Sequence, residues 1–534
     1  MRNHTIARRL EIVVAGVLGL LACGGVAGAA DPLYRLIELD SAEGGSSRAY
    51  SINDAGQVVG WMEASGTRHA GHWHVEVVTD LFGTVHFNLQ HPDIFGVDYS
   101  EAYAISNAGQ IVGTARIEID CPPTITMTNA FVLRPGVLTD LATPYPGDAL
   151  TNLGTLAPAC VAHDSAAAGI SNRNHIVGWA DTGSGIIHAF LETPRDGSFF
   201  VDDNDDGLND LMIDLGTLTS NSDPVSSATA VNDFGEVTGY SYTLATPAGV
   251  AEPTLKAVYH AFLVTPQDTD NDGQLDWFLD DGTGANALMT DLGTLGGYNS
   301  WGRDINSAGQ VVGEADVDPA LNDGRSATHA FFYDGGTMID LGTLAGNFSA
   351  ASAINDNGDI VGWASDADGQ RRAFLYHDGK MYDLNELICT QTGDGMTFVP
   401  NITLTEARDI NRDGWIVGWG STRGSETQET RGFLLIPLDP NDCAAPDDQV
   451  AGDTADSSDS STGNGNDAYS GNPMTGTPGN TSGGNNTPSG NDGATTPTAT
   501  PALCGVGTLA MLPVMMAGLL GMKTVSRRRP GSRL

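Results

Sequence analysis

Two acidic inserts carry the side chains whose types and spacing best suit ion-binding chemistry. In each insert, oxygen-bearing side chains stand at positions 1, 3, 5 and 9 of a loop, with a glycine, Gly207 or Gly273, at position 6. Calcium is a hard cation that needs several oxygen ligands at one point, and the glycine permits the sharp turn that gathers them. The pattern predicts calcium ligands at Asp202, Asn204, Asp206, Asp210, Asp268, Asp270, Asp272 and Asp276.

The twelfth position distinguishes these inserts from an EF-hand, which closes its coordination sphere there with a bidentate glutamate. Ile213 and Leu279 occupy that position, and Asp214 and Asp280 come one residue later. A solvated acidic loop therefore remains the alternative interpretation. Bound calcium is expected to stabilise and rigidify the inserts more than to take part in catalysis.

The charge balance of the chain excludes some partners. Its 534 residues include 66 acidic and 25 basic side chains, for a formal net charge of −41. Such a negative surface repels nucleic acid and the anionic faces of membranes. We expect a monomer without a nucleic-acid partner, which meets a membrane only through its C-terminal tail.

The inserts interrupt a repeated unit whose first motif is INDAGQVVGW, from residue 52 to residue 61. Relatives such as ISNAGQIVGT and INDNGDIVGW are typical of a strand, a tight turn and a second strand. The seven copies place their key hydrophobic residue at Ile52, Ile105, Ile170, Val231, Ile305, Ile354 and Ile410.

The turn of each copy needs one residue with positive φ. A type I turn followed by a left-handed residue favours glycine, and asparagine is the best substitute. The third copy has Asn174 at this position. The other copies have Gly56, Gly109, Gly235, Gly309, Gly358 and Gly414.

Two further motifs complete each repeat. HAFL or a relative starts at His72, Asn129, His188, His260, His329, Arg372 and Arg431. DLGTL or a relative starts at Asp80, Asp140, Asp214, Asp291, Asp340 and Asp383. In RAFLYHDGKMYDL only HDGK separates the two motifs, as expected for a hairpin. Each repeat is therefore predicted to form four strands, the size of one propeller blade.

Comparison of the copies also bears on the role of the side chains that recur within the repeat. Histidine, asparagine and arginine exchange at the first position of HAFL, so a structural hydrogen bond to a neighbour is favoured over metal binding there. The recurring aspartate of DLGTL has the same interpretation. An aromatic residue follows the last glycine of the first motif at Trp61, Trp179, Tyr240, Trp363 and Trp419. Packing between blades is favoured for these rings, and stacking on glycans is the alternative.

The spacing of the motifs predicts how a ring of blades closes. Fourteen residues separate Asp340 from Ile354, and stepping back fourteen from Ile52 reaches Glu38. The last repeat ends at RGFLLIPLDP without a DLGTL strand, so the N-terminal strand is expected to complete it. The prediction is an all-β, seven-bladed β-propeller of four-stranded blades over residues 31–440.

These motifs resemble the HAF-repeat family of extracellular bacterial proteins, which is named for the tripeptide found at His188, His260 and His329. The resemblance covers nearly the whole folded region. It implies a secreted repeat protein with a propeller-like fold, and it supplies no catalytic residues to carry over.

Both ends of the chain are typical of targeting segments. Residues 1–30 combine a basic start, a short apolar run and small residues, which predicts a signal peptide; a lipobox ending at Cys23 is the alternative. Residues 441–502 are rich in Gly, Asn, Ser, Thr and Pro, which predicts a disordered stalk. Residues 503–534 contain an apolar run, predicted to be helical, and a cluster of arginines. They resemble PEP-CTERM-type sorting tails without the Pro-Glu-Pro signature, and a plain membrane anchor is the alternative.

Four cysteines lie between the targeting segments. An oxidising compartment favours disulfides, and three connectivities can be drawn. Local pairing is preferred, which joins Cys121 to Cys160 and Cys389 to Cys443. The second bridge would brace the closure of the ring.

The sequence favours a binding or structural module of the cell envelope over an enzyme. G-x-S-x-G and H-E-x-x-H motifs are absent, and the carboxylates are too numerous to single out a catalytic pair. The expected partner is an envelope glycan or a surface protein, at the cell surface or in secreted form. A propeller hydrolase or lyase acting on glycans is the alternative. It predicts several non-repeated His, Asp, Glu, Arg or Tyr side chains around one mouth of the channel, whereas a scaffold would place repeat-derived side chains there.

Overall fold

A computed structural model describes most of the repeat region. The described residues are 32–41, 45–64, 66–79, 85–89, 93–94, 99–119, 125–134, 150–157, 163–183, 185–220, 224–245, 256–319, 327–390, 399–423, 429–438 and 443. The chain divides into residues 1–454 and 455–534, and all described residues belong to the first unit.

Several predictions concern residues outside this set. They are the signal peptide of residues 1–30, nearly all of the stalk at 441–502, the tail at 503–534, and the Cys121–Cys160 bridge. Within the described residues, no helix has the length and apolar character needed to cross a membrane.

The fold is all-β, as predicted, and its strands follow the repeats. Unit 1 contains β2 Ser47–Ile52, β3 Gln57–Ala64, β4 Thr67–Thr79, β5 Val85–Leu89 and β6 Asp93–Ile94, and unit 2 contains β7 Ser100–Ile105, β8 Ile111–Ile119, β9 Ile125–Leu133 and β10 Leu150–Gly154. Unit 3 contains β11 Ser165–Ile170, β12 Ile176–Asp181, β13 Ile187–Glu192 and β14 Met212–Asp214. Unit 4 contains β15 Ser226–Val231, β16 Val237–Ala245, β17 Lys256–Val264 and β18 Met289–Asp291.

Units 5 to 7 follow the same plan. Unit 5 contains β19 Gly296–Ile305, β20 Val311–Val317, β21 Thr328–Asp334 and β22 Thr337–Gly342. Unit 6 contains β23 Ala345–Ile354, β24 Ile360–Asp366, β25 Arg371–His377 and β26 Lys380–Asp383. Unit 7 contains β27 Ile402–Ile410, β28 Ile416–Thr422, β29 Thr430–Leu438 and β1 Leu33–Leu39. Units 5 and 6 join into one eight-stranded sheet through a single parallel pair, Thr328 with Phe348. A short 3₁₀ helix, η2 Leu384–Glu386, follows β26.

The fourth strands of the first two units differ from the sequence prediction. Asp80 and Asp140 lie outside the described residues. In unit 1, β6 takes the place of the DLGTL strand, because Ile94 pairs with Gly71 as Asp214 pairs with Phe190, while β5 pairs with residues 75–79 of β4. This register puts His69, and not His72, at the first position of the HAFL motif, and the fourth strand of unit 2 is β10. In unit 2, Asn152 of TNLGTL pairs with Phe131, so this later motif takes the place that the sequence analysis gave to Asp140. An asparagine in place of the usual aspartate hid the true match.

The first hairpin of every unit turns as predicted. In unit 6, Gly358 has φ +84° and its N–H donates to the Asn355 carbonyl at 3.1 Å. Positive φ also occurs at Gly56, Gly109, Asn174, Gly235, Gly309 and Gly414. The exception at Asn174 therefore keeps the conformation and changes only the residue that adopts it.

A second glycine of the repeat is required by packing. A Cβ on Gly362 would lie 2.1 Å from the Ala350 carbonyl oxygen and 2.9 Å from the ring of Phe374. Phe374 is the phenylalanine of the HAF motif, and it is fully buried. The glycine of the first motif and the phenylalanine of the second therefore recur together because the ring packs over the bare backbone.

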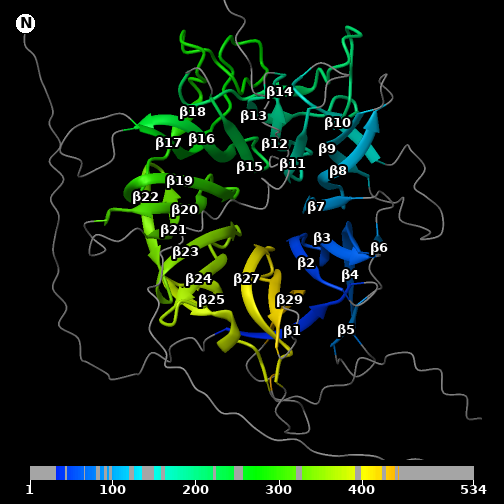
Figure 1. The fold of residues 1–534 in the computed structure, drawn as a ribbon, viewed down its shortest axis with the longest axis vertical. Helices are drawn as coiled ribbons and strands as arrows, with labels where there is room; N and C mark the ends of the chain where they lie inside the picture. Colours follow the sequence, from blue (N-terminus) through cyan, green and yellow to red (C-terminus); the bar gives the residue numbers. More distant parts are fainter. Residues whose placement is uncertain are drawn as a thin grey trace, which may run out of the picture. The chain divides into compact units, whose positions relative to one another are not determined.

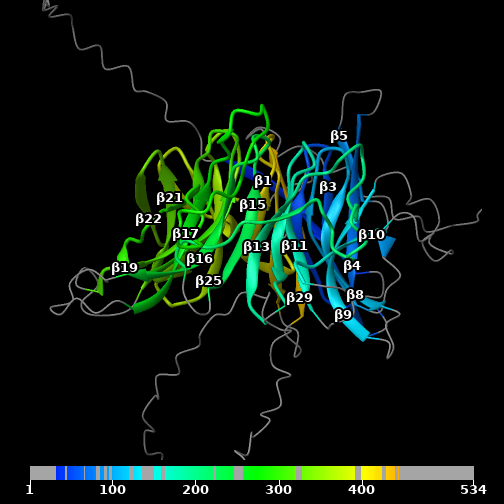
Figure 2. The same ribbon diagram turned by 90° about the horizontal axis from the view of Figure 1, so that it is seen from above.

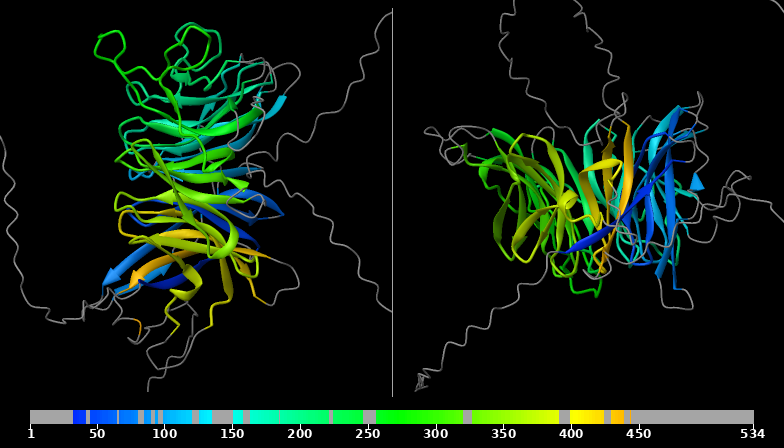
Figure 3. Two further views of the ribbon diagram at one scale, coloured as in Figure 1. Left: turned by 90° about the vertical axis from the view of Figure 1, so that its left-hand side faces the viewer. Right: turned by 90° about the horizontal axis from the view of Figure 1, so that it is seen from below.

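The sheets lie around a common centre, with β2, β7, β11, β15, β19, β23 and β27 innermost (Figure 1). Contacts between these inner strands form a complete cycle, since each touches the next and β27 touches β2. Views from the sides show the sheets standing next to one another (Figure 2, Figure 3). The arrangement is propeller-like, and the apolar core lies between adjacent sheets, as where Val177 and Leu191 of unit 3 pack with Phe262 of unit 4.

Repeated polar contacts join neighbouring units. Ser226 of unit 4 donates to the Gly216 carbonyl and accepts from the Ala189 N–H at 2.8 Å, both in unit 3. Ser165, Ser300 and Ser349 make the same two contacts in their own junctions. At the turns, asparagine side chains donate to the backbone of the next unit, and Asn411 of unit 7 donates to the Asn53 carbonyl of unit 1 at 3.2 Å.

The N-terminal strand joins the last unit, as predicted. β1 pairs antiparallel with β29 over seven register positions, and the two lie side by side in Figure 1. Glu38 stands opposite Phe433, just as Asp214 stands opposite Phe190 in unit 3. The predicted Cys389–Cys443 disulfide is present, with a Cα–Cα distance of 5.6 Å. The backbone N–H of Cys389 also donates to the Tyr34 carbonyl of β1.

Candidate functional site

The first acidic insert connects β13 to β14 and folds around its own carboxylates. The Asp206 N–H donates to Asp202 Oδ1 and to Asn204 Oδ1, at 3.0 Å each. The Gly207 N–H donates to Asp202 Oδ2 at 2.9 Å, and Gly207 has φ +82°. The side chains at positions 1, 3 and 5 therefore face the same turn of backbone.

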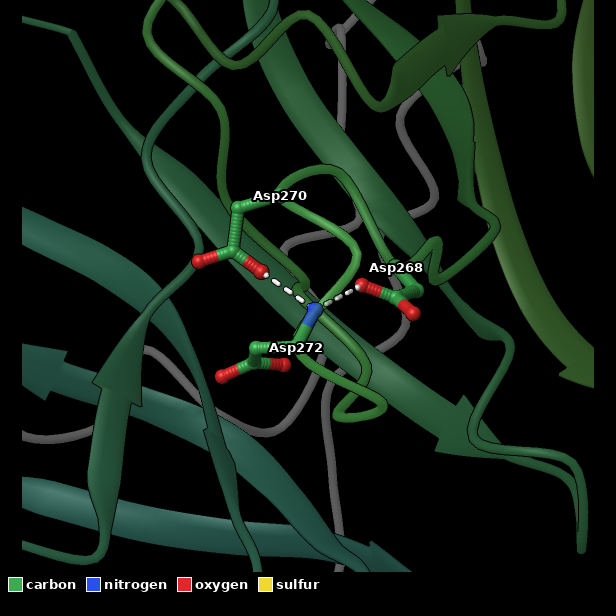
Figure 4. A group of neighbouring side chains, drawn as sticks. All are labelled: Asp268, Asp270 and Asp272. Carbon is green, nitrogen blue, oxygen red and sulfur yellow. Dashed lines mark hydrogen bonds between the residues drawn. The ribbon is translucent and has the colours of Figure 1, made fainter.

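The second insert, between β17 and β18, has the same geometry. The Asp272 N–H donates to Asp268 Oδ1 and Asp270 Oδ1, at 3.1 Å each (Figure 4). One carboxylate oxygen from each of Asp268, Asp270 and Asp272 lies within 4.8 Å of the other two, and all three residues are exposed. The equivalence of the two inserts that the sequence predicted is thus confirmed in their backbone and side-chain arrangement.

The structure does not bring the position-9 side chains into these groups. Asp210 Oδ2 accepts from the Asp203 N–H at 2.6 Å, and Asp276 Oδ2 accepts from the Thr269 N–H at 3.0 Å. The Thr269 hydroxyl also donates to Asp276, and these bonds lower the pKa of the Asp276 carboxyl. One carboxylate oxygen of each position-9 residue therefore braces position 2 of its loop, and the role of Asp210 and Asp276 as calcium ligands stays a prediction.

The aspartates after position 12 are also engaged elsewhere. Asp214 accepts from the Gly216 N–H at 2.7 Å and lies 2.9 Å from His188 Nδ1. Asp280 Oδ1 accepts from the N–H groups of Gly282 and Gly284. Each insert consequently presents the side chains of positions 1, 3 and 5, and further ligands to an ion would be the position-9 carboxylate, water or backbone carbonyls.

The repeated histidines have the structural role that the sequence favoured. Nδ1 of His188, His260 and His329 lies 2.8 to 3.0 Å from the carboxylate of Asp214, Asp291 and Asp340 respectively. Asn129 keeps an equivalent contact by donating to Asn152, whereas Arg431 contacts Asp40, and Arg372 bonds Asp366 at 2.9 Å and lies 4.0 Å from Asp383. Burial acts to raise the pKa of Asp340, but the contact with His329 and the hydrogen bond from the Gly342 N–H together lower it.

A buried glutamate that sequence reasoning missed lies beneath the first insert. Glu192, at the end of β13, is fully buried, and burial raises the pKa of its carboxyl to about 9. Its Oε2 accepts from Asn209 Nδ2 at 3.4 Å. Asn209 also donates to the carbonyls of Leu153 and Phe199, so it fastens the insert to the core.

Replacing Glu192 with glutamine is expected to stabilise the protein at neutral and alkaline pH. The pKa of Glu192 is about 9 in the folded chain, above its value of about 4.5 in the unfolded chain. The free energy of unfolding of the wild type is therefore highest below about pH 4.5 and falls as the pH rises toward 9. Urea unfolding at pH 5 and pH 8 should show the stability advantage of Glu192→Gln over the wild type growing by about 4 kcal/mol between the two pH values. The exposed Glu386→Gln is the control. Equal pH dependence of wild type and Glu192→Gln would contradict the prediction.

A second group of side chains that sequence reasoning missed gathers around the inner strands. Most of these residues are charged or aromatic side chains whose types change from unit to unit, whereas Trp61 and Trp419 belong to the aromatic position that recurs in five units. We call them the central cluster: Arg48, Tyr50, Trp61, Arg68, Glu101, Tyr103, Arg303, Glu314, Arg371, Glu406, Arg408 and Trp419.

One half of the central cluster is built on Glu101 of β7. Its side chain is 1% exposed and accepts from Arg68 Nη1 at 3.1 Å. The hydroxyls of Tyr99 and Tyr103 donate to it at 3.0 and 3.1 Å. A buried carboxylate with three donors is well compensated.

The other half is built on Glu406 of β27. Arg371 of β25 and Arg408 of β27 both contact its carboxylate, the latter at 3.3 Å. The contact between Arg371 and Glu406 repeats the one between Arg68 and Glu101, because each joins a third strand to the inner strand of the next unit. Arg303 and Glu314 form a third pair, in unit 5.

Aromatic rings connect the two halves. The rings of Tyr50 and Tyr103 lie 5.7 Å apart, and those of Tyr50 and Trp419 lie 5.9 Å apart. The guanidinium of Arg48 lies 4.6 Å from the Trp419 ring and 5.7 Å from the Trp61 ring. Trp419 thus packs against Tyr50 of the next unit, as the packing interpretation predicted, and both tryptophan faces also hold arginines.

The electrostatics keep the phenols of the central cluster neutral. Burial, followed by the charge of Glu101, raises the pKa of Tyr50 and of Tyr103 far above the usual tyrosine range. The same causes raise the pKa of Tyr99 to about 12. Protonated phenols donate hydrogen bonds and do not act as bases at neutral pH.

Aligning the repeats provides a signal for this site. Two residues before the key hydrophobic position stand Tyr50, Tyr103, Ala168, Thr229, Arg303, Ser352 and Arg408. Four residues before it stand Arg48, Glu101, Ala166, Ser227, Trp301, Ala350 and Glu406. Units 3 and 4 have only small side chains at these positions, whereas units 1, 2, 5 and 7 supply the charges.

Comparison with known proteins gives a partial family match. Residues 339–466 match the family model described as "Protein of unknown function (DUF3466)". No curated protein matches the chain.

Among solved structures, the chain is similar to the β-propeller domain of the Trilobed protease from Pyrococcus furiosus, at 8% identity and TM-score 0.36 over 77% of this chain and 99% of that one. It is also similar to polysaccharide lyase Uly1, at 8% identity and TM-score 0.39, and the match covers 76% of this chain and 100% of that one. A third similar structure is TolB from Acinetobacter baumannii, at 10% identity and TM-score 0.31, and the match covers 72% of this chain and 81% of that one. Inferences about function therefore rest on the side chains of this chain.

Proposed function

We propose that the chain is a closed, seven-bladed β-propeller of the HAF-repeat type that serves as an extracellular binding module and takes its ligand at the central cluster. The observation that carries this proposal is the contrast between scaffold and cluster. Serine, asparagine and His–Asp contacts repeat around the ring, whereas two inner positions vary in residue type. Four residues before the key hydrophobic residue stand Arg48, Glu101 and Glu406, two residues before it stand Arg303 and Arg408, and units 3, 4 and 6 have small side chains at both positions. Non-repeated charges on a repeated scaffold favour recognition over a purely structural role.

Export and attachment to the cell envelope belong to the same proposal. The signal peptide of residues 1–30, the stalk of residues 441–502 and the sorting tail of residues 503–534 are its basis in the sequence. The Cys389–Cys443 disulfide supports it, because such bonds persist in oxidising compartments.

The binding role can be tested on a glycan array with and without EDTA. The full chain should bind a subset of glycans, and Arg48→Ala should lose that binding while Arg173→Ala, an exposed arginine outside the cluster, keeps it. An array without any bound glycan would count against the proposed binding role.

The alternative function is an extracellular hydrolase or lyase that acts on glycans. The central cluster supports this alternative, because non-repeated Arg, Glu and Tyr side chains on the inner strands are what the sequence analysis expected of an enzyme. The neutral phenols argue against tyrosine as the base. Incubation with mixed polysaccharides, followed by assays for new reducing ends and for unsaturated products, separates the two functions, since a binding module releases neither.

Calcium binding by the two inserts is the second part of the proposal. The support is that Asp268, Asp270 and Asp272 place oxygens within 4.8 Å of one another, and that the first insert repeats the fold around Asp202, Asn204 and Asp206. One carboxylate oxygen of Asp210 and of Asp276 then braces the loop, and the role of both residues as ligands stays a prediction.

Calcium is expected to raise the melting temperature of the purified chain. An ion present at about one hundred times its dissociation constant stabilises by about 2.7 kcal/mol per site. Replacing Asp268, Asp270 and Asp272 with asparagine should remove the contribution of one site, and Asp378→Asn, whose parent side chain is 80% exposed, is the control. The same melting temperature in calcium and in EDTA would refute the calcium sites.

A further inference from the structure

The central cluster concentrates positive charge in an acidic protein. It contains Arg48, Arg68, Arg303, Arg371 and Arg408 against Glu101, Glu314 and Glu406, five positive side chains against three negative ones. The chain as a whole carries a net charge of −41. Long polyanions are repelled by such a molecule, so an anion attracted to the cluster must be short enough to experience mainly the local field.

Arg48 is the arginine with the least compensation. Among the described residues, no carboxylate pairs with it, and its Nε is buried without a hydrogen-bond partner. The rings of Trp61 and Trp419 hold its guanidinium in place. A guanidinium fixed by ring faces keeps its N–H edge available, which is the geometry that recognises a planar carboxylate.

Arg408 lies beside the same rings. Its guanidinium is 5.6 Å from the Tyr50 ring and 5.7 Å from the Trp419 ring, and its side chain is 39% exposed. Arg408 lies 3.3 Å from the Glu406 carboxylate, whereas Arg48 has no carboxylate partner among the described residues, so an anion that reached both would reduce the repulsion between the two guanidiniums. Burial lowers the pKa of the nearby Arg371, and the charges of Arg408 and Arg48 act in the same direction.

Tyr50 adds a neutral donor to this pair. The residue is 7% exposed, and its hydroxyl oxygen accepts from Trp61 Nε1 at 3.0 Å. Among the described residues no group accepts the hydrogen of this hydroxyl, so the phenol can donate to a ligand. The Arg408 guanidinium lies 5.6 Å from the Tyr50 ring and the Arg48 guanidinium lies 4.6 Å from the Trp419 ring, so the phenol and both arginines lie close to these rings, on β2 and β27.

We propose that Arg48 and Arg408, with the Tyr50 hydroxyl, bind the carboxylate of a short acidic ligand with one or two carboxylate groups. This inference rests on the proposed binding role of the central cluster and names the chemistry of its ligand. The central cluster has two more positive than negative side chains, which is enough to balance one or two carboxylates. A larger polyanion would carry more negative charge than the cluster can balance. A sugar acid and a free organic acid share this chemistry.

Isothermal titration calorimetry of the full chain in constant calcium tests the inference. The probes are galacturonate for a sugar acid, succinate for a free organic acid, galactose for a neutral sugar, and inorganic phosphate. Galacturonate or succinate should bind, and galactose and phosphate should not. Binding of galacturonate alone identifies a sugar acid as the ligand, and binding of succinate alone identifies an organic acid.

Arg48→Ala should weaken carboxylate binding by tenfold or more, as expected on removal of a charged hydrogen-bonding partner. Arg48→Lys keeps the charge but loses the planar fork, so it should also bind more weakly. The Arg48→Lys variant still tests the inference if Arg48→Ala does not fold. Arg173→Ala should bind as the wild type does.

Three outcomes would overturn the inference: no carboxylate binds, phosphate binds as well as the carboxylates, or the Arg48 variants bind as the wild type does. Binding of galactose that Arg48→Ala weakens would leave the proposed binding role standing and reject the carboxylate. An empty glycan array concerns the proposed function and not this ligand class.

Discussion

Deleting residues 33–39 is expected to abolish cooperative folding. β1 supplies the fourth strand of the last unit and pairs with β29 at seven register positions. Without it, β29 exposes an unpaired edge, and the core of the junction loses Tyr34 and Leu39, which are 4% and 0% exposed. Ser47 of unit 1 also loses its acceptor, the Leu39 carbonyl.

Circular dichroism and thermal melting measure this effect. The deletion variant should lack a sharp transition or aggregate, whereas a chain that ends after Thr454 should melt as the full chain does, because that cut removes no described residue. A deletion variant that melts cooperatively at the wild-type temperature would show that the ring does not depend on β1.

Phe374→Ala is expected to cost about 3 to 5 kcal/mol of the free energy of unfolding. The ring is fully buried and packs over Gly362, with Ala351, Ile354 and Ile360 in the same core. Its removal leaves a cavity that the rigid hairpin of β23 and β24 cannot fill.

The matched control for Phe374→Ala is Phe348→Ala in the same unit. Phe348 is 43% exposed, so its replacement should change stability by no more than about 0.5 kcal/mol. Denaturant unfolding compares the two variants directly. Equal losses from both would mean that the HAF phenylalanine does not anchor its blade.

The repeated parts of the fold could be predicted from the sequence because each is a local rule. Positive φ at Gly358 or Asn174 follows from the turn chemistry, and the pairing of His188 with Asp214 follows from their joint recurrence. The place of Glu38 opposite Phe433 followed from the spacing of motifs alone. These features depend on short stretches whose residues constrain one another.

The central cluster could not be predicted in this way. Arg48 and Arg408 are 360 positions apart in the chain and meet only because the ring closes between units 7 and 1. The bonds of Asp210 and Asp276 could not be predicted either, since spacing alone does not show that one oxygen of each carboxylate accepts from the N–H of position 2. Irregular fourth strands in units 1 and 2 hid β6 and β10 for a similar reason.

Closure of the ring by β1 is the central claim, and amide hydrogen exchange tests it most directly. If β1 is part of the last unit, peptides covering residues 32–41 and 429–438 should be protected together, to the same degree as peptides from β23 and β24. Exchange of residues 32–41 within seconds, while β23 and β24 stay protected, would contradict a closed ring.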